Sequence, residues 1–517
     1  MKRTIIVAAS LLLICGAYAE LQNVDVGGEV RVRARYWSNT YETGINGPGE
    51  IRIPNFYLPK RPIGPFGAVS RYDWDEKDND LDFVEQRTRL NVDADFTNEV
   101  KAFIELEAYE LWGRDFRSNY ITGADAAAVT TNDVEVYQAY IETNDTFGVP
   151  LRLRIGRQEM KMGKGWLVDD ITTALSGRSF DGVRATYSLD TVDIDAWFSK
   201  LNENGASEQD GDIDFYGIYA TCDAVEWLKA SVYWMYIRDG RSLNDTNFVA
   251  PIEWLEDAFD LDDYDPTNMH TVGARLFGGI SGFDYDLEMA YQFGDASAAG
   301  FGFKPTGFLY GDDDAEFDAW AADFEVGYTV EMAWNPRVYV GGAFFEGEDN
   351  RDLSVIDWLN PFYRADASVS FNRLFPGKPY SFILEIGQDM SNFWQLRGGV
   401  VAHPTEAITA GLQLAMYGVD ETFDAPVTFT VGQFKIPVAP ALSFWTDESS
   451  DDIGTTAHLF VNYQYSEDLY FKAGWEHLFT GDGLEDGNFI HRYGLEFSGG
   501  NDDDDSDYFY LETGLKF

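Results

Sequence analysis

Apolar and polar side chains alternate with a period of two along most of the chain. In residues 24–37 the even positions carry Val24, Val26, Val30 and further mostly apolar residues, whereas the odd positions carry acidic residues and arginines. A period of two is typical of a β-strand with one apolar and one polar face. The pattern therefore predicts an all-β protein. The same alternation recurs in residues 81–96, 100–108, 133–144, 151–158, 178–187, 192–200, 227–236 and 283–293.

The connections between these strands alternate in length. Residues 39–80, rich in Gly, Pro and Asp, follow the first strand, whereas the next connection is the short turn Thr97-Asn98. Long loops at one end and short turns at the other are typical of outer-membrane barrels, so we predict a single transmembrane antiparallel β-barrel of about 18 strands (range 16–22), with long acidic extracellular loops and short periplasmic turns. Residues 427–445 stay ambiguous because Pro437 and Pro440 interrupt them. Further strands are expected at 272–278, 320–330, 337–345, 363–372, 382–388, 394–401, 408–417, 457–465 and 469–479.

The first residues have the pattern of a signal peptide. Lys2 and Arg3 precede an apolar run, and Ala17-Tyr18-Ala19 forms a small-x-small cleavage site. We predict that residues 1–19 are removed and that residues 20–517 form one barrel in the outer membrane of a Gram-negative-type bacterium. The mature chain then keeps one cysteine, Cys222, which fits a small apolar position on a strand.

The chain ends in an amphipathic strand closed by an aromatic residue. Phe509, Leu511, Leu515 and Phe517 share one face of this segment. A terminal aromatic in this setting is similar to the assembly signal of outer-membrane barrels. Outer-membrane lipid and the barrel-assembly machinery are therefore the partners that we expect for the folded chain, with Phe517 as the signal.

Acidic residues outnumber basic ones strongly, with Asp+Glu at 88 against Lys+Arg at 38 and a net charge of −50. This balance argues against nonspecific binding of nucleic acid. An aromatic content of 16% argues against a disordered acidic chain. Clustered carboxylates in the loops suit a solvated surface or, as an alternative, calcium, which favours several oxygen ligands. The calcium candidates are Asp502, Asp503, Asp504 and Asp505, and no other cofactor is predicted.

The residues do not point to an enzyme. The five histidines have no metal-binding spacing, and no GxSxG nucleophile motif occurs. A surface-exposed barrel enzyme therefore remains only the weakest of three functional alternatives.

Several motifs resemble the alginate-export family of outer-membrane barrels. They are GRQEMKMG (156–163), RSFDGVRATY (178–187), EQRTRLNVDADF (85–96), VYQAYIE (136–142) and NYQYSEDLYFKAGWEHLFTGD (462–482). The resemblance implies an 18-stranded monomeric barrel whose arginine-lined lumen passes an anionic uronate polymer outward. Carried over by position, the lumen residues are Arg87, Arg89, Arg152, Arg154, Arg157 and Arg184, and alternation adds Arg31, Arg33 and Arg35.

The predicted lumen faces also carry carboxylates, Glu29, Glu85, Glu105 and Glu107 among them. Arginine can hold an anionic substrate bidentately. As an alternative, the same arginines can pair with the neighbouring glutamates and brace the barrel wall. Two channel functions follow: a channel for an acidic polysaccharide, an oligosaccharide or small anions, and a general or sugar-specific porin. The loops 39–80 and 239–265 are the segments that we expect to act as plugs or lids.

Overall fold

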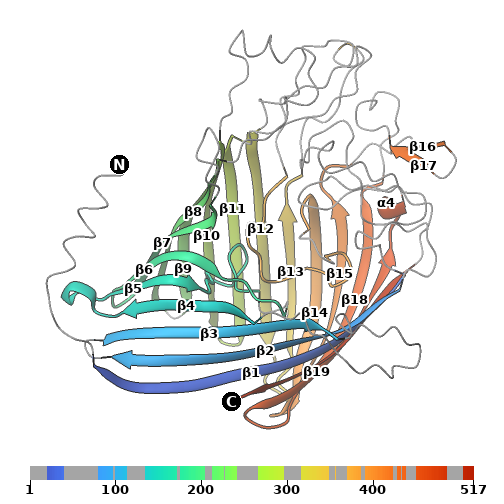
Figure 1. Cartoon of the computed structure of the whole chain (residues 1–517). Coiled ribbons are helices and arrows are strands. Elements are labelled where there is room, and N and C mark those ends of the chain that lie inside the picture. The colour runs from blue at the N-terminus through green and yellow to red at the C-terminus, as the bar shows by residue number, and fades with distance from the viewer. Residues whose placement is uncertain are drawn as a thin grey trace, which may run out of the picture.

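The computed structural model confirms a closed antiparallel barrel of 18 strands (Figure 1). Each barrel strand pairs with the next one, and β20 pairs with β1 to close the ring. The structure describes residues 20–39, 80–96, 99–112, 134–171, 175–203, 212–225, 227–240, 266–295, 316–347, 356, 370–385, 390–422, 428–431, 434–437, 450–485 and 505–517.

The barrel strands are β1 (Leu21–Ser38), β2 (Leu81–Phe96), β3 (Val100–Leu111), β4 (Glu135–Thr143), β5 (Leu151–Gln158), β6 (Phe180–Ser188), β7 (Val192–Asn202), β8 (Ile213–Val225), β9 (Leu228–Asp239), β10 (Thr267–Ile280), β11 (Phe283–Asp295), β12 (Glu316–Thr329), β13 (Arg337–Phe345), β14 (Phe393–Thr405), β15 (Ile408–Val419), β18 (Asp452–Gln464), β19 (Leu469–Thr480) and β20 (Ser506–Lys516). Outside the ring lie the 3-10 turn η2 (Thr146–Gly148), the short helix α4 (Asp482–Glu485) and a hairpin of β16 (Thr428–Val431) and β17 (Phe434–Pro437). Among the described residues, no helix is both long and apolar enough to span a membrane.

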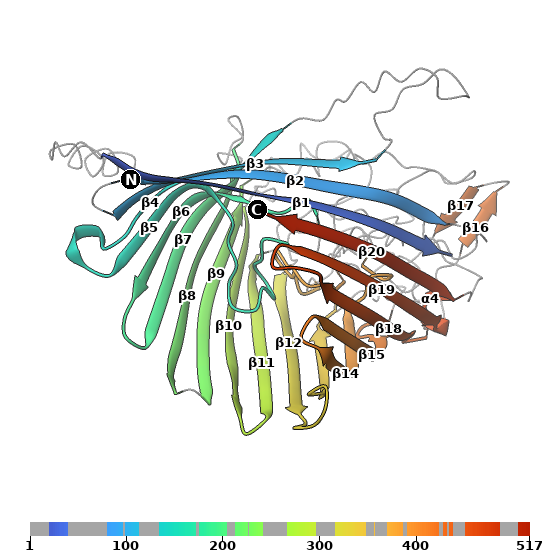
Figure 2. The same cartoon turned by 90° about the horizontal axis from the view of Figure 1, so that it is seen from below.

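The two faces of the barrel wall differ as the alternation predicts. Large apolar side chains project outward, where Ile104 and Leu511 are 50% and 65% exposed. Charged side chains project inward and are buried, as Arg33 and Glu85 show. Apolar groups outside and charged groups inside suit a wall between lipid and a polar lumen. The short turns mark the periplasmic end, which also holds the C-terminus (Figure 2).

The ring closes at a seam between β1 and β20. The backbone N–H of Gly28 donates to the carbonyl of Phe517 at 2.9 Å, and the N–H of Phe517 donates back to Gly28 at 3.1 Å. The terminal ring also lies against this glycine, because a Cβ at position 28 would be 2.6 Å from Cζ of Phe517. The last residue of the chain is therefore part of the wall, and only glycine fits opposite it.

Two of the expected strands are wrong where the structure describes them. Residues 370–372, at the end of the strand expected over 363–372, are not in a strand, and residues 382–385 form turns instead of the strand expected over 382–388. Their apolar side chains face neither lipid nor water, because they belong to a segment folded into the lumen.

Candidate functional site

The arginines of β1 lie on the lumen face beside carboxylates of the neighbouring strands. Arg31 donates from Nη2 to Oε1 of Glu512 on β20 at 2.9 Å. Arg33 donates from Nε to Oε1 of Glu85 on β2 at 2.6 Å, and Nη1 of Arg35 lies 3.6 Å from the same oxygen. All three cations at this wall therefore have a carboxylate partner.

The arginines of β2 are paired in the same way. Nη2 of Arg87 is 2.5 Å from Oε1 of Glu29 on β1. Arg89 donates from Nε to Oε2 of Glu107 on β3 at 2.6 Å and from Nη1 to Oε1 of Glu159 at 3.1 Å. Glu159 follows β5 directly, so Arg89 joins the wall to the chain that enters the lumen.

The arginines of β5 and β6 divide into paired and accessible groups. Nη2 of Arg154 lies 2.7 Å from Oε2 of Glu142, and Nε of Arg184 lies 2.8 Å from Oδ1 of Asp195. Arg152 donates to a threonine hydroxyl at 3.2 Å and has no carboxylate within ion-pair distance in the described part of the chain. Of the described lumen-facing arginines on β5 and β6, Arg152 therefore lacks a carboxylate partner and is half-buried.

The lumen position predicted for Arg157 is wrong. Arg157 shares the parity of Ile155, whose side chain is 53% exposed on the outer face. Arg157 pairs there with Asp181, Nε to Oδ1 at 2.7 Å, and both side chains are about half exposed. The period-two geometry of the strand places the residue outside, whatever the motif around it implies.

Two stretches between strands fold into the lumen. The first inner segment comprises residues 159–171 and 175–179, between β5 and β6. The second inner segment comprises residues 370–385 and 390–392, between β13 and β14. Together they occupy part of the cross-section (Figures 1 and 2), and they were not predicted.

Inward-facing groups of several strands hold the first inner segment. The carbonyl of Leu175 accepts from Nη1 of Arg87 on β2 at 3.0 Å, and the carbonyl of Arg178 accepts from the hydroxyl of Tyr137 on β4 at 3.2 Å. On the other side of the ring, Nζ of Lys164 reaches carboxylates of β11 and β12. This segment therefore crosses the lumen.

A buried glutamate on β19 holds the second inner segment. Glu476 accepts a hydrogen bond from the Ser381 hydroxyl at 2.6 Å and from the backbone N–H of Phe382 at 3.2 Å. The carbonyl of Phe382 accepts from Nε1 of Trp37 on β1 at 3.0 Å. Ile383 and Leu384 are fully buried, and burial of each such side chain contributes about 1.5–3 kcal/mol. An apolar core thus lies inside the polar lumen.

A short parallel bridge joins the two inner segments at Val168 and Phe375. The N–H of Asp169 donates to the carbonyl of Phe375 at 3.0 Å, and the N–H of Phe375 donates to the carbonyl of Leu167 at 2.8 Å. Gly165 has φ 78°, and a Cβ there would lie 1.7 Å from Oδ2 of Asp169. The close approach at this junction therefore requires glycine.

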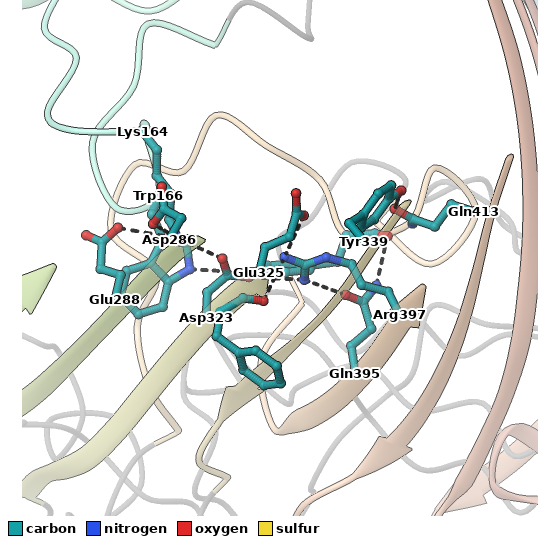
Figure 3. Close-up of polar contacts among 12 residues, drawn as sticks. Lys164, Trp166, Asp286, Glu288, Asp323, Glu325, Tyr339, Gln395, Arg397 and Gln413 are labelled. Atoms are coloured by element: carbon teal, nitrogen blue, oxygen red, sulfur yellow. Dashed lines mark hydrogen bonds and ion pairs between the residues drawn. The ribbon is translucent and has the colours of Figure 1, made fainter. Parts of the chain in front are cut away.

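Asp323 on β12 connects both inner segments to the wall, and Figure 3 shows it between Lys164 of the first inner segment and Arg397 of β14. This buried carboxylate accepts from Nζ of Lys164 at 2.7 Å, from the Tyr380 hydroxyl at 3.0 Å and from Nη1 of Arg397 at 3.1 Å. Nε1 of Trp166 donates to the same tyrosine oxygen at 2.9 Å. One carboxylate thus receives groups from the first segment, the second segment and β14.

A pair of adjacent carboxyl groups lies at the junction of the inner segments. Burial, followed by the hydrogen bond and charge of Asp169, raises the pKa of Asp170 to about 7. Burial opposes ionisation of Asp169 as well, but hydrogen bonds from Asp170 and from Lys161, whose Nζ is 2.7 Å from Oδ2, leave the pKa of Asp169 lowered. The junction therefore holds a proton that can be lost near neutral pH.

The second inner segment carries a cation that is open to the lumen. The side chain of Lys378 is exposed, yet desolvation by the surrounding groups and, after it, the charge of Arg397 lower the pKa of its amine, against the opposing charge of Asp323. None of the carboxylates in the described ranges is within ion-pair distance of its amine. Lys378 was missed in the sequence because it stands alone in a segment that was interpreted as loop and strand.

Other predicted site residues fall partly outside the described residues. Of the loops 39–80 and 239–265, only Asn39, Asp80, Asp239 and Gly240 lie within the described residues. Of the calcium candidates only Asp505 is described; it accepts from the Thr480 N–H at 3.1 Å. Within the described ranges, no group of three or more His, Cys, Asp or Glu side chains is arranged to hold a metal ion.

A lipid-facing apolar band, a polar lumen with charged side chains and two segments that fold inward define an outer-membrane β-barrel channel of the Gram-negative type. A family model described as alginate export matches residues 74–491. The chain belongs to this alginate-export family.

Solved structures match this chain at low identity. OccK11 (OpdR) of Pseudomonas aeruginosa matches with a TM-score of 0.47 and 9% identity, over 95% of this chain and 96% of that chain. OprD of the same organism matches with 0.48 and 10%, over 96% and 97%. OccAB1 of Acinetobacter baumannii matches with 0.48 and 11%, over 95% and 97%. Among curated proteins, none matches this chain.

Proposed function

We propose that this outer-membrane channel passes an acidic oligosaccharide or polysaccharide, and that accessible cations rather than the paired wall arginines hold it. The observation that carries the proposal is the exposed side chain of Lys378 on the second inner segment, whose amine has no carboxylate within ion-pair distance in the described part of the chain. Arg152 on β5 adds a second accessible cation. Family membership supports an exported polymer as the solute.

The physical basis of the proposed transport is weak binding of the polyanion at several sites along the lumen. A cation in a lumen narrowed by two inner segments attracts a passing carboxylate more strongly than it would in bulk water. Several such cations of modest affinity let a polyanion enter and still leave. The carboxylates beside the other arginines keep those sites from trapping the solute.

A general or sugar-specific porin is the second candidate. The ion pairs of Arg31, Arg33, Arg87 and Arg154 favour it, because a wall of matched charges has little preference for anions. In this alternative the predicted lumen arginines brace the barrel, and small solutes pass regardless of the sign of their charge. An enzyme receives no support from the family, whose described activity is export.

Conductance of the purified protein in a planar bilayer separates the two candidates. We expect anion selectivity under a salt gradient and block of the current by an oligouronate. The double variant Arg152→Ala, Lys378→Gln should weaken this block about tenfold, the loss expected for a charge-assisted contact. Arg157→Gln is the matched control, because Arg157 lies on the outer face, and its block should equal that of the native protein.

Cation selectivity without block by the oligouronate would reject the polysaccharide proposal and favour the general porin. Block by a neutral oligosaccharide of equal length would favour a sugar-specific porin.

We further propose that the barrel is a monomer and that Phe517 is the residue recognised by the assembly machinery. The place of Phe517 in the seam supports this role, because its backbone pairs with Gly28 on β1 and completes the wall. Phe517→Ala should lower the amount of folded barrel in the outer membrane, as measured by heat-modifiable mobility in gels. An unchanged amount would assign Phe517 to the wall alone.

A further inference from the structure

A recess of about 430 Å³ opens in the lumen wall formed by β9 to β13. Its volume is in the range of small-molecule sites, about 300–1,000 Å³. The side chains around it combine both signs of charge with an aromatic ring. The lining residues are Lys229, Phe277, Gly278, Asp284, Tyr285, Asp286, Glu325 and Arg337.

The recess lies at the periplasmic end of the lumen. Arg337 is the first residue of β13, and Lys229 and Asp284 are the second residues of β9 and β11. These strands begin at the short turns, which mark the periplasmic side. A solute that enters from the periplasm therefore reaches the recess before it reaches the inner segments.

Most charges of the recess are matched. Nη2 of Arg337 is 2.5 Å from Oδ1 of Asp284 and 3.0 Å from Oε1 of Glu325. Asp286 accepts from Nε of Arg275 at 3.0 Å. Lys229 differs, since no described carboxylate lies within ion-pair distance of its amine. The recess thus offers several oxygen acceptors and one uncompensated ammonium group.

The aromatic member is held in place by a cation. The guanidinium of Arg275 lies 4.1 Å from the ring centre of Phe277, a cation–π contact that restricts the ring. Because Arg275 also binds Asp286, the ring is fixed relative to the carboxylates. The recess therefore has a preformed apolar surface beside its polar groups.

We propose that this recess is a periplasmic-side binding subsite for one acidic sugar unit. The inference rests on the proposed function and adds a site where the polymer is first held. The carboxylates accept hydrogen bonds from sugar hydroxyls, Lys229 binds the sugar carboxylate, and the C–H face of the sugar ring packs on Phe277. Each element of the ligand has a counterpart in the lining.

Other ligand classes fit this set less well. A compact polyanion such as phosphate would meet three carboxylates, Asp284, Asp286 and Glu325, close to the single free ammonium. A polycation would meet Lys229 and Arg337. A hydroxyl-rich unit with one negative charge uses the acceptors and the ammonium together, because neutral hydroxyls donate to carboxylates without repulsion.

The recess is also next to the inner segments. Asp286 lines the recess and accepts from Nζ of Lys164 at 3.2 Å, and Glu325 lines it while lying 3.5 Å from Nη2 of Arg397. A sugar held in the recess would therefore contact Asp286 and Glu325, which in turn contact Lys164 and Arg397 near Lys378.

The test uses block of the current by an oligouronate added separately to the periplasmic and extracellular sides of the bilayer. We expect Lys229→Gln to raise the concentration for half-block from the periplasmic side about tenfold, with a much smaller change from the other side. Lys229→Arg should restore block, and Phe277→Leu should weaken it. The control is Lys101→Gln on β3, whose amine is already 3.0 Å from Oδ1 of Asp95; its block should stay native.

Equal block in Lys229→Gln and the native protein, with block weakened in Arg152→Ala, Lys378→Gln, would overturn the recess subsite and leave the proposed function intact. Absence of block in the native protein from either side would instead refute the proposed function. If a neutral oligosaccharide blocks the native protein and Lys229→Gln weakens that block as well, the inference is also overturned. The lysine would then not be binding the carboxylate of the sugar.

Discussion

The wall at β1, β2 and β20 and the two inner segments both carry cations into the lumen, but they hold them differently. At the wall, Arg31 and Arg33 are buried and lie within 2.9 Å and 2.6 Å of carboxylate oxygens. On the second inner segment, Lys378 is exposed and has no such partner among the described residues. The arginines of the wall are numerous but buried in ion pairs. A cation that a solute can contact must instead have an exposed side chain without a carboxylate partner.

The largest expected effect is a loss of barrel stability on substitution of a buried wall arginine. Arg33→Met removes the closest cation from the buried carboxylate of Glu85. Breaking a buried ion pair lowers the free energy of unfolding by about 3–5 kcal/mol. The urea midpoint of the barrel in lipid vesicles should therefore fall, while ion selectivity stays native. The double variant Arg33→Met, Glu85→Leu should recover part of the stability, because the buried carboxylate is removed together with its closest partner, although Arg35 then loses its carboxylate. Native stability with altered selectivity would show that Arg33 serves the solute.

A smaller effect is expected where the inner segments meet the wall. Asp323→Asn weakens the bonds from Lys164, Tyr380 and Arg397, and a loss of about 2 kcal/mol raises the undocked population by a factor of about 30. Single-channel conductance should rise and fluctuate more. Glu325→Gln is the control, because Glu325 pairs with Arg337 and Arg397 of the wall. Equal conductance in both variants would mean that Asp323 does not hold the segments.

The smallest effect concerns pH at the junction of the segments. The pKa of Asp170 is raised to about 7, above the ordinary value of about 3.9, so the docked form binds the proton more tightly than the undocked form. Its contribution to docking is complete below the ordinary pKa and is lost as the pH rises through 7. Conductance should therefore be higher at pH 8 than at pH 6.

The variant Asp170→Asn removes this titration while it keeps the shape of the side chain. Its conductance should be equal at the two pH values. A native protein whose conductance falls between pH 6 and pH 8 would contradict the assignment, because loss of the proton can only weaken docking.

The barrel itself was predictable because alternation is a local property of each strand. Val30 and Val32 face outward, whereas Arg31 and Arg33 face inward, as their positions in the sequence require. The same rule, applied to Arg157, would have placed this residue outside; the motif around it led to the wrong face. Alternation thus carried more information than resemblance at that position.

The inner segments could not be predicted in the same way. Ile383 and Leu384 look like residues of a lipid-facing strand, yet they are buried within the lumen. An apolar side chain in the sequence predicts burial, but it does not indicate whether lipid or another part of the protein covers that side chain. Asp323 illustrates the same limit for polar groups, since the partners Lys164 and Tyr380 come from segments that are adjacent only after the barrel closes.

The seam between β1 and β20 has a consequence for folding and for specificity of pairing. Arg31 and Glu512 are 481 positions apart, so their contact forms only when the first and last strands of the barrel meet. Until then β1 presents an open edge, which can pair with a foreign strand. A slip of one residue in β20 would turn Glu512 toward lipid and Leu511 toward the lumen. The Arg31–Glu512 pair therefore favours in-register closure of each chain on itself over edge-to-edge association with another.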